Sequence, residues 1–543
     1  MNCRLVTAVL LFLAHSFSYS QVKTQVPPYV LSWFQQHLEK SSKQVLQNID
    51  SNDFFFRDSF RLVGYLKGYD ISQKFKTGII YIKNDLNGMD FPTVVKIYED
   101  GRFETTVPMW YPKVLNMDLK DIWVTFYAEP GQVLAMVLDW QAFQKNEKDR
   151  SVFKYYGPLA EINTQLNQFP AVELDYDQLA KDVTTVTPEL FKNRVLKNWD
   201  EQRSKLDAGL SGNNYPVKLK RLIKAKQDMD FTLFILSYTM HRRFEKMSDS
   251  TNNALKEPLP ADFFDFLKRL DQNNNALMIS TEFYYLINRL EYEEAFNAVN
   301  NFFNKFWGAP LEKERKMNRL RDSISRTIFY MEKGRIYDAL KLQYALKAYR
   351  YSLQNNDSLK VQYNEELKAT LENDFYKAEA DFILARSKAL DSGKGFNMPA
   401  SYAGSVLKKI VAPYKGKTIF IDFWATTCAP CVGGIKNMKL TRQKYKNNPD
   451  FVFLFITSEN ESPKKDYDDF IKEQELENTV YLNIDDYRYL RELFRFNGIP
   501  RYAVVSDKGA IINDNFQVGL FEDELPRLLP KYRKDTGKMD RIK

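Results

Sequence analysis

Residues 421–431 read IDFWATTCAPC, and this stretch decides the fold expected for the last part of the chain. The apolar run Thr418–Phe423 has the length and composition of a buried β-strand. A helix is expected to begin at Cys428, because Pro430 is tolerated in a first helical turn, whose backbone N–H groups have no partner within the helix. The tripeptide Gly-Ile-Pro at Gly498–Pro500 then stands immediately before another apolar run. The pattern predicts a strand followed by a helix with two cysteines at its start.

The residues around this stretch alternate between expected strands and expected helices. The other strands are 451–457, 502–506 and 511–513, and the helices are 428–447, 464–475, 487–496 and 522–529. Strand–helix–strand units imply parallel pairing, whereas the turn at 507–509 adds an antiparallel hairpin. Residues 400–543 are therefore expected to form an α/β domain, with a mixed sheet covered on both faces.

The preceding residues divide into two regions. Residues 21–175 contain short apolar-alternating runs separated by turn residues, which predicts a small β-rich, sandwich-like antiparallel domain. Its expected strands are 62–65, 79–82, 94–98, 103–107, 123–127 and 133–138. Residues 176–391 have long charged and aromatic stretches at helical spacing, which predicts an α-helical domain of about six to eight helices. Residues 392–399 begin Ser-Gly-Lys-Gly and are expected to be a linker.

Residues 1–20 have the composition of a secretory signal peptide. Arg4 precedes an apolar run over residues 6–14, and small residues then favour cleavage before Gln21. A membrane anchor is the weaker alternative, because this run is shorter than the ~20 residues that cross a bilayer. Cys3 precedes the run, so the segment offers no lipoprotein cysteine. We expect export to the periplasm, with secretion to the medium also open and no stable membrane span after cleavage.

Cleavage would leave two cysteines, Cys428 and Cys431, in the mature chain. Cysteines this close cannot restrain a long loop, so a structural disulfide framework is not expected. A structural zinc site needs four ligands, and His37 and His241 are remote in the sequence, so no metal is expected. Redox chemistry remains for such a pair. The 78 Lys and Arg residues exceed the 70 Asp and Glu residues only slightly, which gives little reason to expect a nucleic-acid partner.

The two cysteines, the strand before them and Gly498–Pro500 together resemble the thioredoxin superfamily, most closely the exported TlpA-like thiol–disulfide oxidoreductases. The resemblance covers about residues 400–535, which implies a thioredoxin-like fold for that part. A short β-domain with a strand similar to Phe126–Gln132 often precedes such domains in exported proteins of the Bacteroidetes. The resemblance thus implies a Bacteroidetes-type exported protein with a large N-terminal extension.

Three residues are expected to carry the chemistry. At the helix start, unpaired backbone N–H groups and the positive end of the helix dipole favour a thiolate at Cys428, the attacking sulfur. Cys431 falls within the same turn, close enough for a disulfide, and is expected to be the more buried, resolving thiol. Asp422 matches the family's buried acid, whose raised pKa lets it shuttle the proton of Cys431. Relatives often place a Glu at the position of Gly434, so here Asp422 would act alone.

Four further residues are expected to face the client. Trp424 matches the family's aromatic residue beside the site, and Thr427 stands where an aromatic residue usually precedes the first cysteine. Pro500 matches the proline whose cis peptide bond lies against the dithiol. That bond would leave the backbone of Ile499 free to pair with an extended client segment.

The expected function is reduction of disulfides in client proteins, with electrons from a membrane or periplasmic thiol donor and no bound cofactor. Oxidase or isomerase activity would use the same residues and stays open. A second hypothesis is a binding or scaffold protein whose redox domain is regulatory or vestigial. A third is a peroxidase of the peroxiredoxin type, which wants a Thr where this chain has Ala425.

Overall fold

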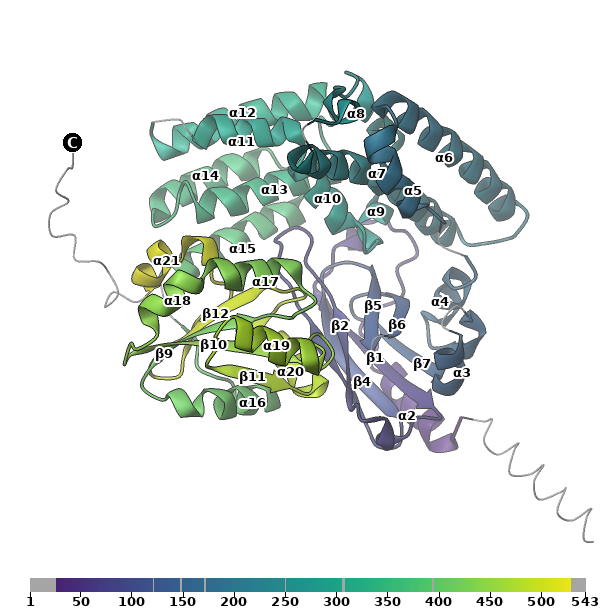
Figure 1. Cartoon of the computed structure of the whole chain (residues 1–543). Helices are drawn as coiled ribbons and strands as arrows, with labels where there is room; N and C mark the ends of the chain where they lie inside the picture. The colour runs from purple at the N-terminus through teal and green to yellow at the C-terminus, as the bar shows by residue number, and fades with distance from the viewer. Residues whose placement is uncertain are drawn as a thin grey trace, which may run out of the picture.

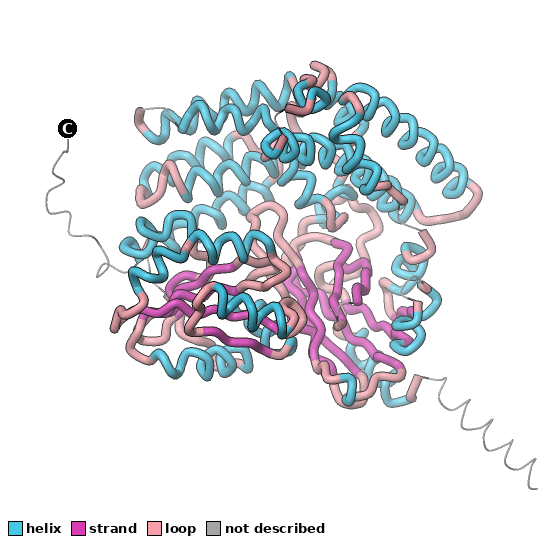
Figure 2. The backbone as a smooth tube through the Cα atoms, in the orientation of Figure 1, coloured by secondary structure: helices cyan, strands magenta, loops and turns pink. Residues whose placement is uncertain are grey.

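The computed structural model describes residues 26–528, apart from residues 121, 147–148, 170–171, 250, 305–307 and 393–394. The expected signal peptide lies outside the described residues. The described chain has a β-rich N-terminal part, a central helical part and a C-terminal α/β part, in the predicted order (Figure 1). Figure 2 shows the strands in two groups, with most of the helices stacked above them.

The N-terminal part contains one mixed sheet of eight strands, in the order β6-β5-β2-β3-β4-β1-β7-β8. The strands are β1 (Asp58–Lys67), β2 (Thr77–Tyr81), β3 (Thr93–Ile97), β4 (Arg102–Met109), β5 (Lys113–Leu119), β6 (Ile122–Ala128), β7 (Val133–Asp139) and β8 (Phe153–Tyr156). Neighbouring strands are antiparallel except β1 and β7, which run parallel. Short helices flank this sheet: α2 (Pro28–Leu38), α3 (Trp140–Lys145) and α4 (Ala160–Leu166).

The two-sheet sandwich expected for residues 21–175 is wrong, because the layer that faces the sheet is helical. A sheet must bury its apolar face against another layer. One hydrophobic cluster joins sheet residues such as Leu62 and Phe126 to helix residues such as Phe231 and Leu340. The sheet and the helical region therefore share a core across residue 175. Strands β5 and β8 have no counterpart among the expected strands.

The helical part contains more helices than expected, since short ones give little periodic signal. They are α5 (Tyr176–Thr185), α6 (Pro188–Ser211), α7 (Val217–Ser248), α8 (Asn253–Lys256), α9 (Asn275–Ile279), α10 (Phe283–Glu291), α11 (Glu294–Asn304), α12 (Pro310–Thr327), α13 (Arg335–Arg350), α14 (Asp357–Ala369) and α15 (Asp374–Asp391). Helix α6 begins where the Thr187 hydroxyl accepts from the N–H of Leu190 and Pro188 occupies the first turn.

The C-terminal part, here called the redox domain, has a five-stranded mixed sheet in the order β11-β10-β9-β12-β13. Its strands are β9 (Thr418–Phe423), β10 (Phe451–Ser458), β11 (Thr479–Leu482), β12 (Arg501–Val505) and β13 (Ile511–Asn513). Its helices are α16 (Tyr402–Val411), α17 (Ala429–Asn437), α18 (Lys439–Tyr445), α19 (Lys464–Glu473), α20 (Ile484–Phe494) and α21 (Phe521–Leu528). Helices cover both faces of this sheet, as predicted, whereas edge strand β11 was not expected.

The redox domain is fastened to the N-terminal sheet through α20. Arg488, which is almost completely buried, donates to the carbonyl oxygen of Thr77 at 2.7 Å and to the carboxylate of Asp118 at 3.0 Å. One turn earlier, the Asp485 carboxylate accepts from the Thr77 hydroxyl at 2.6 Å. One turn later, the Glu492 carboxylate accepts from a backbone N–H of β3 at 2.9 Å. One side of α20 therefore binds strands β2 and β3, which are interior strands of the N-terminal sheet.

Candidate active site

The two cysteines lie at the start of α17. Cys428 is the capping residue, and its sulfur accepts from the backbone N–H of Cys431 at 3.2 Å. The two sulfurs are joined in a disulfide, with 5.2 Å between the Cα atoms. Cys428 is half-buried and Cys431 is completely buried. An incoming disulfide can therefore reach Cys428 alone, and the helix dipole stabilises a thiolate at that position.

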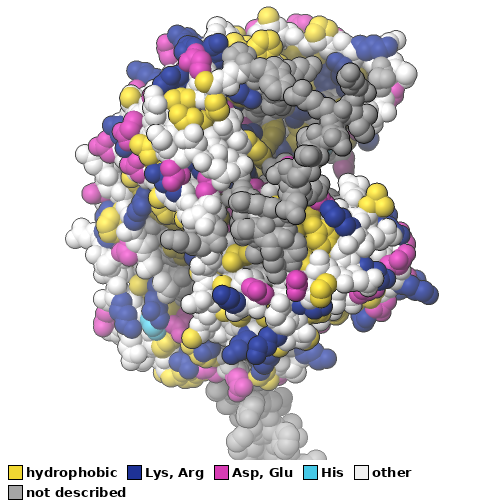
Figure 3. Space-filling view, turned by 90° about the vertical axis from the view of Figure 1, so that its left-hand side faces the viewer, with side chains coloured by type: hydrophobic (Ala, Val, Ile, Leu, Met, Phe, Trp, Pro, Cys, Tyr) yellow, Lys and Arg dark blue, Asp and Glu magenta, His cyan; other side chains and the backbone are white. Residues whose placement is uncertain are grey.

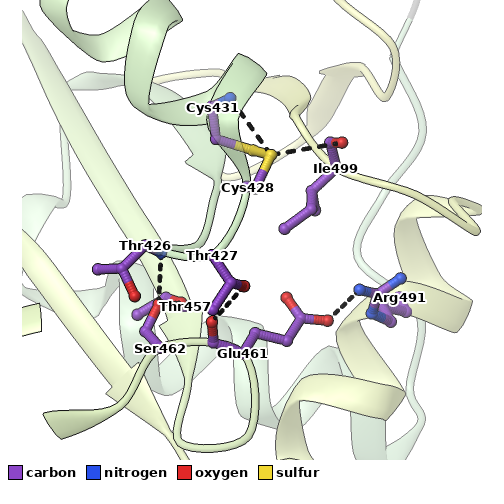
Figure 4. The surroundings of a disulfide bond; sticks show 9 residues. All are labelled: Thr426, Thr427, Cys428, Cys431, Thr457, Glu461, Ser462, Arg491 and Ile499. Carbon is purple, nitrogen blue, oxygen red and sulfur yellow. Dashed lines mark hydrogen bonds and ion pairs between the residues drawn. A yellow bond between two sulfur atoms is a disulfide. The ribbon is translucent and has the colours of Figure 1, made fainter. Parts of the chain in front are cut away.

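The loop before β12 lies against the disulfide. The Ile499–Pro500 peptide bond is cis, and the carbonyl oxygen of Ile499 lies 3.7 Å from the sulfur of Cys428 (Figure 4). Both residues are half-buried. The predicted site residues Ile499 and Pro500 thus border the sulfur that is open to solvent, at a place where an extended chain could pair with the backbone.

A second loop, residues 459–462, supports the segment before Cys428. The exposed side chain of Thr427 donates its hydroxyl to the carbonyl oxygen of Glu461 at 2.8 Å. The backbone N–H of Thr426 donates to the Ser462 hydroxyl at 3.0 Å. The Glu461 carboxylate forms an ion pair with Arg491 of α20 (Figure 4). Sequence reasoning missed Glu461 and Arg491, since no short motif links residues that lie this far apart.

Asp422 lies in β9 on the face that α17 covers. Its neighbours on that face, Phe420 and Trp424, share a hydrophobic cluster with Cys431. Burial raises the pKa of Asp422 to about 8, and the positive charge of Arg442 opposes part of that rise. Oxygen Oδ1 of Asp422 has no hydrogen-bond partner among the described residues. The carboxyl group is therefore protonated over most of the neutral range and titrates near the pKa of an ordinary thiol.

Arg442 of α18 is the cation whose charge lowers the pKa of Asp422. Its guanidinium donates to the carbonyl oxygens of Ile435 and Gln474, the latter at 3.1 Å. Burial lowers the pKa of Arg442, and the charge of Asp422 opposes that change. Sequence reasoning also missed this residue, because α18 and β9 are brought together only by the fold.

Trp424 packs beside the two cysteines, as predicted, but its burial does not fit the expected contact with a client. The indole is completely buried and packs against Tyr467 and Phe470 of α19, with ring centroids 6.1 and 5.1 Å away. It therefore supports the loop before Cys428 from beneath and has no surface with which to contact a client. Of the four residues expected to face a client, Thr427 is exposed and Ile499 and Pro500 are half-buried.

Gly434 has a steric reason to be a glycine. A Cβ atom at this position would lie 2.9 Å from the Tyr502 hydroxyl oxygen of the neighbouring strand. A glutamate, which the resemblance would place here, therefore does not fit unless Tyr502 moves. Asp422 remains the buried carboxyl group on this face of β9.

The described residues contain no group of three or more His, Cys, Asp or Glu side chains that could hold a metal ion. Over the same residues, no helix is both long and apolar enough to cross a membrane.

Comparison with known proteins identifies the C-terminal part. The Redoxin family matches residues 396–522. The chain is similar to the thioredoxin domain of a thiol-disulfide oxidoreductase from Bacteroides vulgatus, with 22% identity over 23% of this chain and 84% of that one and a TM-score of 0.20. A thiol:disulfide interchange protein from Bacteroides sp. is 22% identical over 24% of this chain and 81% of that one, with a TM-score of 0.20. A thiol:disulfide interchange protein from Chlorobium tepidum is 20% identical over 22% of this chain and 83% of that one, with a TM-score of 0.19.

No curated protein matches the chain. The structural matches cover less than a quarter of it, at TM-scores of 0.20 and below. The family match therefore assigns residues 396–522 to a Redoxin domain, and the Cys428–Cys431 pair lies within it.

Proposed function

We propose that this protein is a TlpA-like thiol–disulfide oxidoreductase that works outside the cytoplasm, in the periplasm, and reduces disulfides in client proteins. The observation that carries the proposal is the position of the Cys428–Cys431 disulfide at the start of α17, with the accessible sulfur beside the Ile499 carbonyl. The Redoxin match supports the redox class. The signal-like composition of residues 1–20 supports export.

The first step of the proposed reaction uses the reduced pair. The Cys428 thiolate attacks one sulfur of the client disulfide, so that bond breaks and a mixed disulfide forms between Cys428 and the client. The second client sulfur leaves as a thiolate and takes up a proton. The dipole of α17 assists this step because it favours the ionised form of Cys428 before attack.

The second step releases the client. Cys431 gives its proton to the ionised fraction of Asp422, attacks the sulfur of Cys428 and expels the second client thiol. Because the pKa of Asp422 is raised to about 8, close to that of a thiol, this proton transfer has little free-energy cost. Two electrons have then moved from the cysteine pair to the client, and a membrane or periplasmic thiol donor must return them. No bound cofactor is needed, since the sulfurs carry the electrons.

Reduction of insulin by the full chain, with a dithiol as donor, tests the proposal. We expect turnover in the wild type and its loss in Cys428→Ser. We also expect Cys431→Ser to accumulate clients as stalled mixed disulfides when it is expressed in the periplasm. The double variant Cys428→Ser/Cys431→Ser should capture none. Undiminished insulin reduction by Cys428→Ser would remove the nucleophile assignment. Recovery of non-covalent partners alone would favour the scaffold hypothesis.

A further inference from the structure

A cavity of about 390 Å³ lies where the three parts of the molecule meet. Helices α10, α13 and α15 line one side of it, and residues 87–90 of the N-terminal sheet's β2–β3 connection line another. The redox domain contributes Arg495, Arg501, Asn515 and Gln517. This volume falls in the range of sites that bind small ligands or short segments of chain.

Positive charge dominates the lining. The cavity is bordered by five cationic side chains, Lys347, Arg350, Arg386, Arg495 and Arg501, and by two carboxylates, Asp90 and Glu291. Both carboxylates are already engaged: Asp90 accepts from the N–H of Asn497 and pairs with Lys83, and Glu291 pairs with Lys347 at 2.9 Å. Arg350 and Arg495 are exposed and form no ion pair within the described part of the chain.

The arginines in this lining are close enough to repel one another. Burial lowers the pKa of Arg386; its ion-pair partner Asp514 opposes this change, whereas the charges of Arg495 and Arg350 add to it. The pKa of Arg501 falls to about 10, chiefly through burial; Asp514 and Asp90 oppose the change, and Arg386 and Arg350 add to it. An anion placed among these groups would relieve that repulsion in a partly desolvated space, where charge interactions are strong.

The cavity and the disulfide lie at the same end of strands β9 and β12. Strand β12 runs antiparallel to β9, so its first residue, Arg501, lies opposite Phe423, the last residue of β9. The loop to Cys428 leaves β9 at that end. Residues 514–517 follow β13, which is antiparallel to β12, so they return to this end of the strands as well. Arg501 is also the next residue after Pro500, so the cavity adjoins the backbone proposed to pair with a client.

The rest of the lining suits a polypeptide better than a small ion. Tyr292, Tyr351 and Phe382 border the cavity and are 44%, 54% and 39% exposed. Arginine and aromatic side chains together are the composition of protein-binding surfaces. Over the described part of the face that Figure 3 draws, Lys and Arg are interleaved with Asp and Glu.

We infer that this cavity binds an acidic, aromatic-containing polypeptide segment. The inference rests on the proposed function in one respect: we assign the segment to the client chain, next to the disulfide that is reduced.

The test measures binding without redox chemistry. A fluorescently labelled, cysteine-free peptide of alternating Glu and Tyr is titrated with the full chain at low ionic strength, and anisotropy is recorded. We expect binding that weakens with added salt, and a Kd raised about tenfold or more in the double variant Arg350→Gln/Arg495→Gln. Arg326→Gln/Lys508→Gln removes two exposed charges elsewhere and should leave the Kd unchanged.

Three outcomes of the peptide titration would overturn the inference. They are no binding of the peptide, an unchanged Kd in Arg350→Gln/Arg495→Gln, and equal binding of the same peptide with Gln in place of Glu. Binding of citrate or inorganic phosphate as tight as that of the peptide would assign the cavity to small anions and would also overturn it.

A second measurement separates this inference from the proposed function. For a peptide disulfide flanked by Glu, the double variant should raise KM about tenfold and leave kcat unchanged. If the wild type binds the acidic peptide but reduces no disulfide, the proposed function fails and the cavity assignment stands. If it reduces disulfides and the double variant has the wild-type KM, the cavity assignment fails alone.

Discussion

The two faces of the redox-domain sheet are covered in different ways. On one face, α17, α19 and α21 of the same domain enclose Asp422 and the buried sulfur of Cys431. On the other face, α16 and α20 form the cover, and α20 is itself packed between this sheet and strands β2 and β3 of the N-terminal sheet. One face, here called the chemical face, therefore carries the groups of the proposed reaction, and the other, here called the attachment face, joins the domain to the rest of the chain.

The sequence of α20 shows why this helix needs a second partner. Asp485, Arg488 and Glu492 recur at intervals of three and four residues, so they lie along one side of the helix. All three bond to the N-terminal sheet. An isolated redox domain would leave this charged stripe to water and would lose these bonds. The comparison shows that contacts with the N-terminal sheet satisfy charged groups of the redox domain.

The largest effect is expected on the chemical face, from Asp422→Asn. Because the pKa of Asp422 is raised from 3.8 to about 8, the folded protein keeps a proton that the unfolded chain has released. Its stability therefore falls as the pH rises from about 4 to about 8 and is level above that. Asn does not ionise, so the variant should be more stable than the wild type by about 4 kcal/mol at pH 7.

Urea unfolding of Asp422→Asn across this pH range measures the effect. The stability gain should vanish near pH 4 and grow steadily up to pH 8, while insulin reduction falls by about 10²-fold because the proton acceptor is lost. Asp469→Asn changes an exposed carboxylate of α19 and serves as the control. A gain that does not depend on pH would show that Asp422 titrates normally.

The attachment face should respond to Arg488→Met. Removing one partner of a buried ion pair leaves the Asp118 carboxylate without this cation and is expected to cost about 3 kcal/mol. Since Arg488 joins α20 to the N-terminal sheet, faster amide exchange in β2 and α20 should accompany the loss. Lys465→Met, on the exposed side of α19, is the matched control.

Arg488→Met/Asp118→Leu should recover part of that loss, because the uncompensated charge is removed. Reduction of a small aromatic disulfide should continue in both variants, since the bond lies on the face without the cysteines. Wild-type exchange rates in Arg488→Met would mean that α20 is held by its apolar contacts alone.

The same contrast explains what the sequence could predict. Strand β9, the helix start at Cys428 and the cis bond before Pro500 were predicted correctly, because each is specified by a few contiguous residues. The burial of Trp424 was missed, since α19, which covers it, comes forty positions later in the chain. Strand β11 was missed because its residues are all half-buried at an edge and carry no alternation.

Contacts between distant segments could not be predicted from the sequence, for a related reason. The helical layer on the N-terminal sheet was predicted as a second sheet, since strand periodicity shows that one face is apolar but not what covers it. Likewise, Arg442 and Arg491 looked like ordinary charged residues of helices. Their partners, Asp422 and Glu461, lie 20 and 30 positions away, and only the assembled fold brings them together.

The smallest effect should come from Asn497, where the two faces meet. Its side-chain amide donates to the carbonyl oxygen of Ile82 at 3.1 Å, which ties the loop before Pro500 to the N-terminal sheet. Asn497→Ala removes this bond but keeps the bond from its backbone N–H to Asp90. We expect a loss of about 1 kcal/mol in stability and about fivefold in kcat/KM for a protein disulfide.

A small disulfide does not need to pair with the loop, so Asn497→Ala should reduce it as fast as the wild type does. The control Asn447→Ala, on the exposed surface, should reduce both protein and small disulfides at the wild-type rate. That difference between substrates is the informative result. It would mean that the attachment face holds the client-pairing backbone in place and so acts on the chemical face through the loop. Equal losses on both substrates would place the effect of Asn497 on the sulfurs themselves, and the two faces would then be independent in function.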